Sequence, residues 1–353
     1  MTATTELPAP ASRHALALLR FPDARTDWVV VTVASVAQPM SDLAELGERI
    51  DTLHAAVPVV GARLEGEMWM PGPPPEVVVV EGEPIGHPEL DRPFDLAGEP
   101  PLRIMVGADG TRLALAGHHA AFDGLALVAV LAALTGGPMP SPVASPPPGE
   151  PGSKLPLLAR LLRPADAVTP TPGVWPGDTY ASQVVEVSGK GITGALAEAC
   201  VAAVAAHNES HGDRLAKVGI TVAVGGPAGV GNVASYRRID VKPRGPVARL
   251  VQEALASPDE PGEQVSAPKA LMALLAPVVE RFSDTILLSN LGRHDVPGVT
   301  RIDFFPVARG RSAVCFASAA VVGGDTTLTL RARDLSPSEG RRLLADASAR
   351  VAP

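Results

Sequence analysis

Apolar positions in the first third of the chain alternate between strand-like and helix-like spacing. Runs of β-branched and apolar residues predict strands at 28–36, 59–64, 77–80, 102–106 and 113–116. Apolar residues three or four positions apart predict an amphipathic helix at 43–56, and a further apolar run predicts a helix at 125–134. Asp42 stands where it can cap the first helix, and Asp109-Gly110 forms a hairpin turn between the last two strands.

The same mixture of elements returns after residue 178. Strands are expected at 182–187, 220–224, 239–241, 284–288, 313–322 and 326–332. Helices are expected at 191–206, 246–256 and 268–281, and a last helix begins at Ser336-Pro337. Helices that pack on mixed sheets in both halves predict an α/β protein with two sandwich-like lobes.

A proline-rich stretch separates the two halves of the chain. Prolines recur from residue 138 to residue 176. Proline lacks a backbone donor and fixes φ, so no long helix or central strand can run through most of this stretch. Only 155–162 has the pattern of a short apolar helix. We therefore expect an N-terminal lobe at 1–137, a linker at 138–178 and a C-terminal lobe at 179–353.

Composition narrows the functional classes. Hydrophobic residues make up 46% of the chain and aromatic residues 3%, which indicates an aliphatic core and excludes a disordered chain. The net charge of -8 argues against a nucleic-acid partner, because phosphate binding needs a positive field. The sequence has no apolar run of ~18 residues and no pattern of a secretory leader, so we expect a cytoplasmic protein without a membrane partner. The two cysteines, Cys200 and Cys315, lie in apolar segments and are expected in the core.

The polar cluster most suited to catalysis lies between the hairpin and the helix that follows it. His118 and His119 end a strand, and side chains alternate along a strand, so one imidazole can enter a cleft while the other supports the turn. Asp123 stands at the N-cap of the next helix, and Gly124 lets the backbone approach a ligand closely. Free N–H groups at that helix start suit an oxyanion, and a neutral imidazole suits proton transfer near neutral pH.

These residues alone leave two other interpretations open. The histidines and Asp123 could only cap the helix and form a hydrogen-bonded pair, since short motifs also occur by chance. A metal site is the second alternative, but adjacent histidines do not place both rings on one face. No partner with metal-binding spacing accompanies them, so no metal is expected there.

Residues 92–124 resemble the condensation-domain branch of the chloramphenicol-acetyltransferase-like acyltransferase superfamily. The run Phe94-Asp95-Leu96, a Pro-Pro-Leu-Arg run at 100–103, a hairpin and a complete HHxxxDG motif follow one another in the order of that family. Residues 57–64 resemble an early family segment, and 289–292 with the strand and helix after it resemble the second lobe. The resemblance covers most of the chain except the first two dozen residues and the proline-rich linker.

The resemblance implies a fold and roles for individual residues. Two chloramphenicol-acetyltransferase-like α/β sandwich lobes would form a pseudo-dimer with a central tunnel, which donor and acceptor enter from opposite faces. His119 would take the proton from the acceptor as it attacks a thioester, and Asp123 would hold the motif loop. The Gly124 N–H would donate to the oxyanion. Asn290, with its neighbour Ser289, would position substrate from the other lobe.

The function implied is that of a stand-alone condensation-like acyltransferase in bacterial natural-product biosynthesis, such as nonribosomal peptide or polyketide assembly. It would join an acyl group from an acyl or peptidyl carrier protein, or from coenzyme A, to an amine or alcohol, without a cofactor. Residues 222–231 lack the arginine that pairs with the motif aspartate in many family members. Two alternatives therefore stay open: cyclisation, elimination or epimerisation of a bound intermediate, and non-catalytic binding of acyl chains or a carrier.

Three further patterns have weaker implications. Residues 229–234 fit GxGxxA, but a strand is expected after them, so a dinucleotide would find no helix N-terminus. His207 and His211 are four apart near a helix end, and we expect a frayed surface end because no third ligand lies nearby in sequence. His294 is expected in a loop, with a place at the tunnel rim as the alternative.

Overall fold

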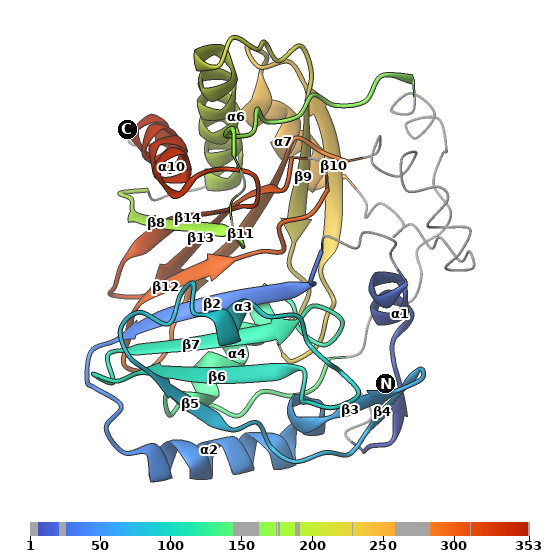
Figure 1. Ribbon diagram of the computed structural model, residues 1–353, viewed down its shortest axis with the longest axis vertical. Helices are drawn as coiled ribbons and strands as arrows, with labels where there is room; N and C mark the ends of the chain where they lie inside the picture. The colour runs from blue at the N-terminus through green and yellow to red at the C-terminus, as the bar shows by residue number, and fades with distance from the viewer. Residues whose placement is uncertain are drawn as a thin grey trace.

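The computed structural model describes residues 6–20, 26–143, 162–173, 175, 177–187, 191–227, 229–257, 283–310 and 312–351. It confirms the predicted α/β architecture with two lobes, each built on one large sheet (Figure 1). A small third sheet joins β1 (Ala9–Pro10), β4 (Met68–Met70) and β3 (Arg63–Glu65). No helix within the described ranges has the length and apolar character needed to cross a bilayer.

The first lobe contains a five-stranded sheet. Its order is β12 (Val299–Phe305), β2 (Val29–Val36), β7 (Arg112–His118), β6 (Leu102–Gly107) and β5 (Val77–Val80). The predicted hairpin joins β6 to β7, and Asp42 caps α2 (Leu43–Ala56) by accepting from two backbone N–H groups. Helix α4 (Gly124–Leu134) has an apolar surface all round, because it packs on this sheet on one side and on the second lobe on the other.

The second lobe contains a six-stranded mixed sheet. Its order is β10 (Ser235–Val241), β9 (Val218–Val224), β11 (Ile286–His294), β13 (Val314–Val321), β14 (Thr326–Ala332) and β8 (Thr179–Val184). Helices α6 (Ile192–Ser210), α7 (Val247–Ala256) and α10 (Pro337–Val351) cover the face that points away from the first lobe (Figure 1). The core between them is aliphatic except for Phe316.

Strand β12 connects the two lobes. It lies late in the sequence, yet it pairs antiparallel with β2 of the first sheet. On its other side, the hydroxyl of Thr327 in β14 donates to the carbonyl oxygen of Ile302 at 2.6 Å. All strands of the six-stranded sheet follow residue 178, whereas β12, which also follows residue 178, belongs to the sheet of the other lobe.

A buried arginine forms a second connection between the lobes. The guanidinium of Arg331 in β14 donates to the carbonyl oxygen of Val29 in β2 at 2.5 Å and pairs with Asp178 at 2.6 Å. Beside it, the hydroxyl of Tyr180 in β8 donates to Asp91 at 2.6 Å, at the end of α3 (Pro88–Asp91). These contacts satisfy polar groups that the meeting of the lobes removes from water.

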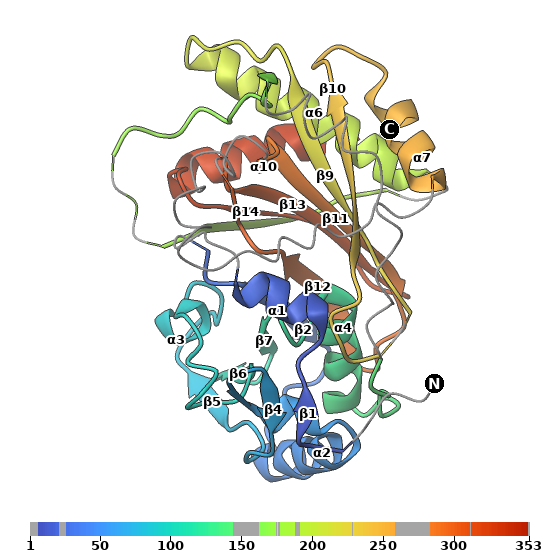
Figure 2. The ribbon, with the colours of Figure 1, turned by 90° about the vertical axis from the view of Figure 1, so that its right-hand side faces the viewer.

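Some predicted elements differ from those observed. The strand predicted at 59–64 is wrong: Pro58–Gly61 forms a short 3-10 helix (η1), and only Arg63–Glu65 is extended. Proline at the first position of η1 favours a helical start, which overrides the β-branched pattern. The sequence missed β12 and α1 (Arg13–Leu19), a short helix at the level where the lobes meet (Figure 2). The helix expected at 268–281 and most of that at 155–162 lie outside the described residues.

Candidate active site

A cavity of about 170 Å³ lies between the lobes. The start of α4 and strand β2 contribute to its wall from the first lobe, and strands β9, β10 and β11 contribute from the second. Five of the six predicted site residues line it, namely His119, Asp123, Gly124, Ser289 and Asn290. His118 does not line this cavity.

The imidazole of His119 is fixed by contacts on both ring nitrogens. Nδ1 lies 2.9 Å from the carbonyl oxygen of Phe122, and a carbonyl can only accept, so Nδ1 carries the proton. Nε2 therefore carries the lone pair of the neutral ring, and it lies 3.1 Å from the hydroxyl of Tyr236. The ring also stacks on Trp28, with centroids 6.4 Å apart and planes 22° apart. The tautomer needed for accepting a proton at Nε2 is thus set by the backbone.

The surroundings of His119 favour its neutral form. Burial lowers the pKa of His119 to about 4, the Phe122 carbonyl opposes this shift, and the positive charge of Arg309 adds to it. The imidazole is therefore uncharged near neutral pH and able to accept a proton.

Tyr236 is a functional candidate that the sequence did not single out. It lies on β10 of the second lobe, lines the cavity, and burial raises the pKa of its hydroxyl. The hydroxyl therefore remains protonated near neutral pH and donates to Nε2 of His119. The acid-base pair is complete only when both lobes are in contact.

His118 has a supporting position in the turn. Its Nδ1 accepts from the backbone N–H of Ala120 at 3.1 Å, and its ring meets Phe94 edge to face at 5.9 Å. Burial lowers the pKa of His118 to about 3, so it too is neutral. The alternation expected for the two histidines is observed, because His119 lines the cavity and His118 supports the turn.

Asp123 holds the two lobes together through backbone contacts. Its Oδ1 accepts from Ala126 N–H at 2.9 Å as the N-cap of α4, and its Oδ2 accepts from Val233 N–H at 3.0 Å in the second lobe. Burial raises its pKa, and these backbone donors oppose the shift. Within the described part of the chain, Asp123 is held by backbone N–H groups, one of them from the second lobe.

Gly124 allows the lobes to approach closely. A Cβ at this position would lie 2.7 Å from the side chains of Leu291 in β11 and Phe304 in β12. The residue is thus required by packing at the junction, in addition to the predicted role of its N–H at the start of α4.

The glycine-rich connection between β9 and β10 crosses to the first lobe. Val230 exchanges backbone hydrogen bonds with Ser141 and Val143 of the proposed linker, and the carbonyl oxygen of Gly231 accepts from the N–H of Asp123 in the first lobe at 3.2 Å. Gly229 has φ +142, and a Cβ there would lie 2.2 Å from Val143. These glycines allow the close backbone approach at this crossing. The GxGxxA pattern is followed by strand β10, so it does not lead into a helix.

Asn290 lines the cavity, but its amide already has partners. Nδ2 donates to the hydroxyl of Thr193 at 2.9 Å, and Oδ1 accepts from Gly292 N–H at 3.0 Å. Its neighbour Ser289 is buried in the cavity wall. His294 is not among the residues that line the cavity, and its Nε2 lies 2.8 Å from the Leu291 carbonyl.

Two further residues near His119 carried no signal in the sequence. Arg309 lines the cavity, with its guanidinium 6.0 Å from the Trp28 ring centroid and 5.5 Å from that of Tyr236. No carboxylate pairs with Arg309 in the described ranges. His14 of α1 does not line the cavity, but it interacts electrostatically with His119 and Arg309; burial lowers its pKa to about 4, and its Nε2 has no hydrogen-bond partner among the described residues. Their grouping depends on how the lobes meet, which local patterns do not encode.

No protein-family model matches this sequence, and no curated protein sequence matches it significantly. Solved structures do match over nearly the whole chain. The first condensation domain of the calcium-dependent antibiotic synthetase, in complex with a substrate analogue, has a TM-score of 0.58 at 15% identity, covering 98% of this chain and 96% of that one. The starter condensation domain of rhizomide synthetase, in complex with C8-CoA and Leu-SNAC, has a TM-score of 0.57 at 10% identity, covering 98% and 93%.

An epimerization domain is similar as well. The domain from the third module of tyrocidine synthetase B has a TM-score of 0.59 at 10% identity, covering 99% of this chain and 97% of that one. At these identities the likeness establishes the fold. The chain has the condensation-domain-like, two-lobe fold that the HHxxxDG segment predicted.

Proposed function

We propose that this protein is a condensation-like acyltransferase that joins a thioester-activated acyl group to an amine or alcohol. The observation that carries the proposal is the lone pair of His119 Nε2 at the wall of a cavity between two lobes of condensation-domain-like fold. The same cavity carries a tyrosine hydroxyl, a guanidinium and the start of a helix.

The chemistry follows from these groups. The acceptor nitrogen or oxygen attacks the thioester carbon, and Nε2 of His119 takes the proton that the acceptor loses. The thioester oxygen becomes negative, and the N–H of Gly124 and the charge of Arg309 offset that negative charge. When the carbon–sulfur bond breaks, the leaving thiolate takes the proton from His119, which restores the neutral ring. Burial and Arg309 disfavour the protonated imidazole, which favours this return.

The donor we propose is an acyl group on a carrier protein or on coenzyme A. Two similar structures support a thioester of this kind, since one holds a substrate analogue and the other C8-CoA with Leu-SNAC. Donor and acceptor would reach His119 through a central tunnel from opposite faces. Asp123 and His118 position the loop that carries the base, and Ser289 and Asn290 form the wall opposite it.

Epimerisation or another proton-transfer reaction on a bound intermediate is the second candidate. The pairing of a base at His119 with a protonated hydroxyl at Tyr236 favours it, since one group can remove a proton and the other return one. The likeness to an epimerization domain is compatible with this chemistry.

Mass spectrometry of reaction mixtures distinguishes the candidates. The full chain is incubated with a panel of acyl thioesters of coenzyme A and of N-acetylcysteamine, together with amines and alcohols. A condensed product that disappears in His119→Ala, and persists in His87→Ala, a variant of a half-buried histidine that does not line the cavity, supports acyl transfer. A product of unchanged mass that chromatography separates from the substrate, or one that has lost water, supports the second candidate. Binding of an acyl thioester without turnover would instead identify a non-catalytic binding module.

A further inference from the structure

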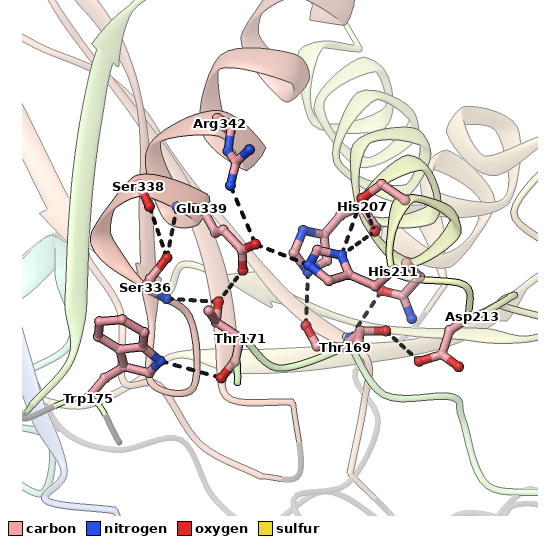
Figure 3. A network of polar contacts seen from close by, with 12 residues as sticks. Thr169, Thr171, Trp175, His207, His211, Asp213, Ser336, Ser338, Glu339 and Arg342 are labelled. Carbon is pink, nitrogen blue, oxygen red and sulfur yellow. Dashed lines mark hydrogen bonds and ion pairs between the residues drawn. The ribbon is translucent and has the colours of Figure 1, made fainter. Parts of the chain in front are cut away.

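A second cluster of ionisable side chains lies on the outer side of the second lobe. His207 and His211 occupy the last turn of α6 and its C-cap, and Glu339 lies in the first turn of α10 (Figure 3). We expected no third ligand beside this histidine pair, because none lies nearby in sequence. The packing of α10 against α6 corrects this, since it brings the distant Glu339 beside the two rings.

The geometry of the three side chains suits a shared ion. The i, i+4 spacing puts both imidazoles on one side of α6, with ring centroids 4.5 Å apart. One nitrogen of each histidine and one oxygen of Glu339 lie within 4.8 Å of one another. Ligand atoms around a four-coordinate metal ion at about 2 Å are separated by roughly 3–4 Å, so small side-chain movements close the site.

The hydrogen bonds around the cluster orient its ligand atoms. Nδ1 of His211 lies 2.9 Å from the carbonyl oxygen of His207, so this nitrogen carries the proton and Nε2 faces Glu339 Oε1 at 3.0 Å. A backbone carbonyl on the far nitrogen is the usual support of a metal-bound histidine. The other oxygen of Glu339 accepts from the hydroxyl of Thr171, which fixes the carboxylate plane.

Two neighbouring contacts compete with an ion for these side chains. Nε2 of His207 lies 2.9 Å from the carbonyl oxygen of Thr169, so coordination through that nitrogen requires the ring to release the carbonyl. Arg342 competes for Glu339, but its nitrogen is 3.4 Å from the carboxylate and its side chain is 75% exposed, so it can move into water. His211 and Glu339 keep their present orientation.

We propose that His207, His211 and Glu339 form a binding site for a divalent transition-metal ion of the zinc type, with water as the fourth ligand. Two imidazoles and one carboxylate are a donor set that zinc accepts, and hard ions such as magnesium prefer oxygen ligands. The ion would join the end of α6 to the start of α10 and hold the C-terminal helix on its sheet. The site is separate from the central cavity and does not depend on the proposed reaction.

Calorimetric titration with zinc chloride tests the site on the full chain after chelator treatment and dialysis. We expect one equivalent of zinc to bind. The variants His211→Ala and Glu339→Gln should lose affinity by at least the roughly 10- to 100-fold that removal of an outer-shell partner costs. Glu209→Gln is the matched control, since this carboxylate lies in the same turn but faces Arg244 at 3.7 Å.

Thermal unfolding supplies a second measurement. Zinc should raise the Tm of the wild-type chain and of Glu209→Gln, because an ion that binds only the folded state stabilises it. It should leave the Tm of His211→Ala unchanged. Absence of stoichiometric binding to the wild type, or equal binding by His211→Ala and wild type, would overturn the proposal. Circular dichroism of each variant without zinc confirms that it is folded.

Discussion

Nε2 of His119 and the hydroxyl of Tyr236 lie 3.1 Å apart, although the two residues belong to different lobes. The base is therefore oriented by its own loop through Phe122 and engaged by the other lobe through the tyrosine. A substitution that moves the lobes apart would therefore change the hydrogen bonding of His119 even if it does not contact that residue. This relationship allows the role of the tyrosine to be separated from effects on folding.

Tyr236→Phe should lower kcat of the proposed transfer by about tenfold or more, because the positioned hydroxyl beside the base is lost. The chain contains two tyrosines, and Tyr180→Phe is the matched control. It removes the hydrogen bond to the partly buried Asp91, so it should cost about 1–3 kcal/mol of unfolding free energy and leave kcat unchanged. Steady-state kinetics and urea unfolding of both variants check this. Equal kcat for Tyr236→Phe and wild type would show that the hydrogen bond from this hydroxyl to His119 does not contribute to the transfer.

Arg309→Met should move the acid limb of the pH–rate profile to higher pH. The positive charge of Arg309 lowers the pKa of His119, so its removal raises that pKa from about 4. The rate needs the neutral imidazole and is retained above this pKa, so activity will be lost at a higher pH than in the wild type. We also expect kcat to fall, because the charge facing the substrate is lost. Arg249→Met, on the exposed side of α7, is the control. An unshifted acid limb would show that Arg309 does not act on the base.

Acid should destabilise the folded chain through its buried histidines. Burial lowers the pKa of His119 and His14 to about 4 and that of His118 to about 3, against 6.5 for a free imidazole. Below pH 6.5 the unfolded chain binds protons that the folded chain excludes. The stability due to these neutral rings is therefore complete above pH 6.5 and is lost as the pH falls towards 4. Each histidine contributes a slope of about 1.4 kcal/mol per pH unit.

Urea unfolding between pH 4 and 7 measures this slope. His118→Asn should reduce it by about one proton, whatever its effect on the absolute stability. Burial raises the pKa of Asp123, which acts in the opposite direction at low pH, but this contribution is common to both proteins. His87→Ala serves as the control because His87 is half-buried, unlike the buried His118. A slope equal to that of the wild type in His118→Asn would contradict the assignment.

Gly124→Ala should destabilise the protein and reduce activity together. The new methyl group would overlap Leu291 and Phe304, so the lobes must shift apart or repack, at a cost of about 1–3 kcal/mol. The matched control is Gly47→Ala in the middle of α2, where a Cβ meets nothing within 4 Å. That substitution should stabilise the helix by roughly 0.5–1 kcal/mol and leave kcat unchanged. Denaturation midpoints and kcat of the two alanine variants give the comparison.

The sequence could predict those features that depend on neighbouring residues. The turn at Asp109-Gly110, the N-cap at Asp123 and the opposite facing of His118 and His119 follow from local rules of turns, caps and strands. The structure shows all three, and the solved structures confirm the fold that the motif implied.

The features that the sequence missed depend on contacts between distant segments. Strand β12 contains Arg301 and Asp303, which form an ion pair with each other. These two charged residues interrupt the apolar pattern by which a buried strand is predicted from sequence. Tyr236 and Arg309 gain their significance from the meeting of the two lobes. The arginine sought for Asp123 was not needed because a backbone N–H from the other lobe reaches the carboxylate.

The pairing of β12 with β2 also sets an order for folding during synthesis. One edge of β2 stays without its neighbour until residues 299–305 have left the ribosome, after most of the chain is made. A fragment ending before the proline-rich linker would present that edge to other chains and would tend to aggregate. Co-expression of the missing half supplies the absent strand in trans, so the two halves should behave as complementing fragments.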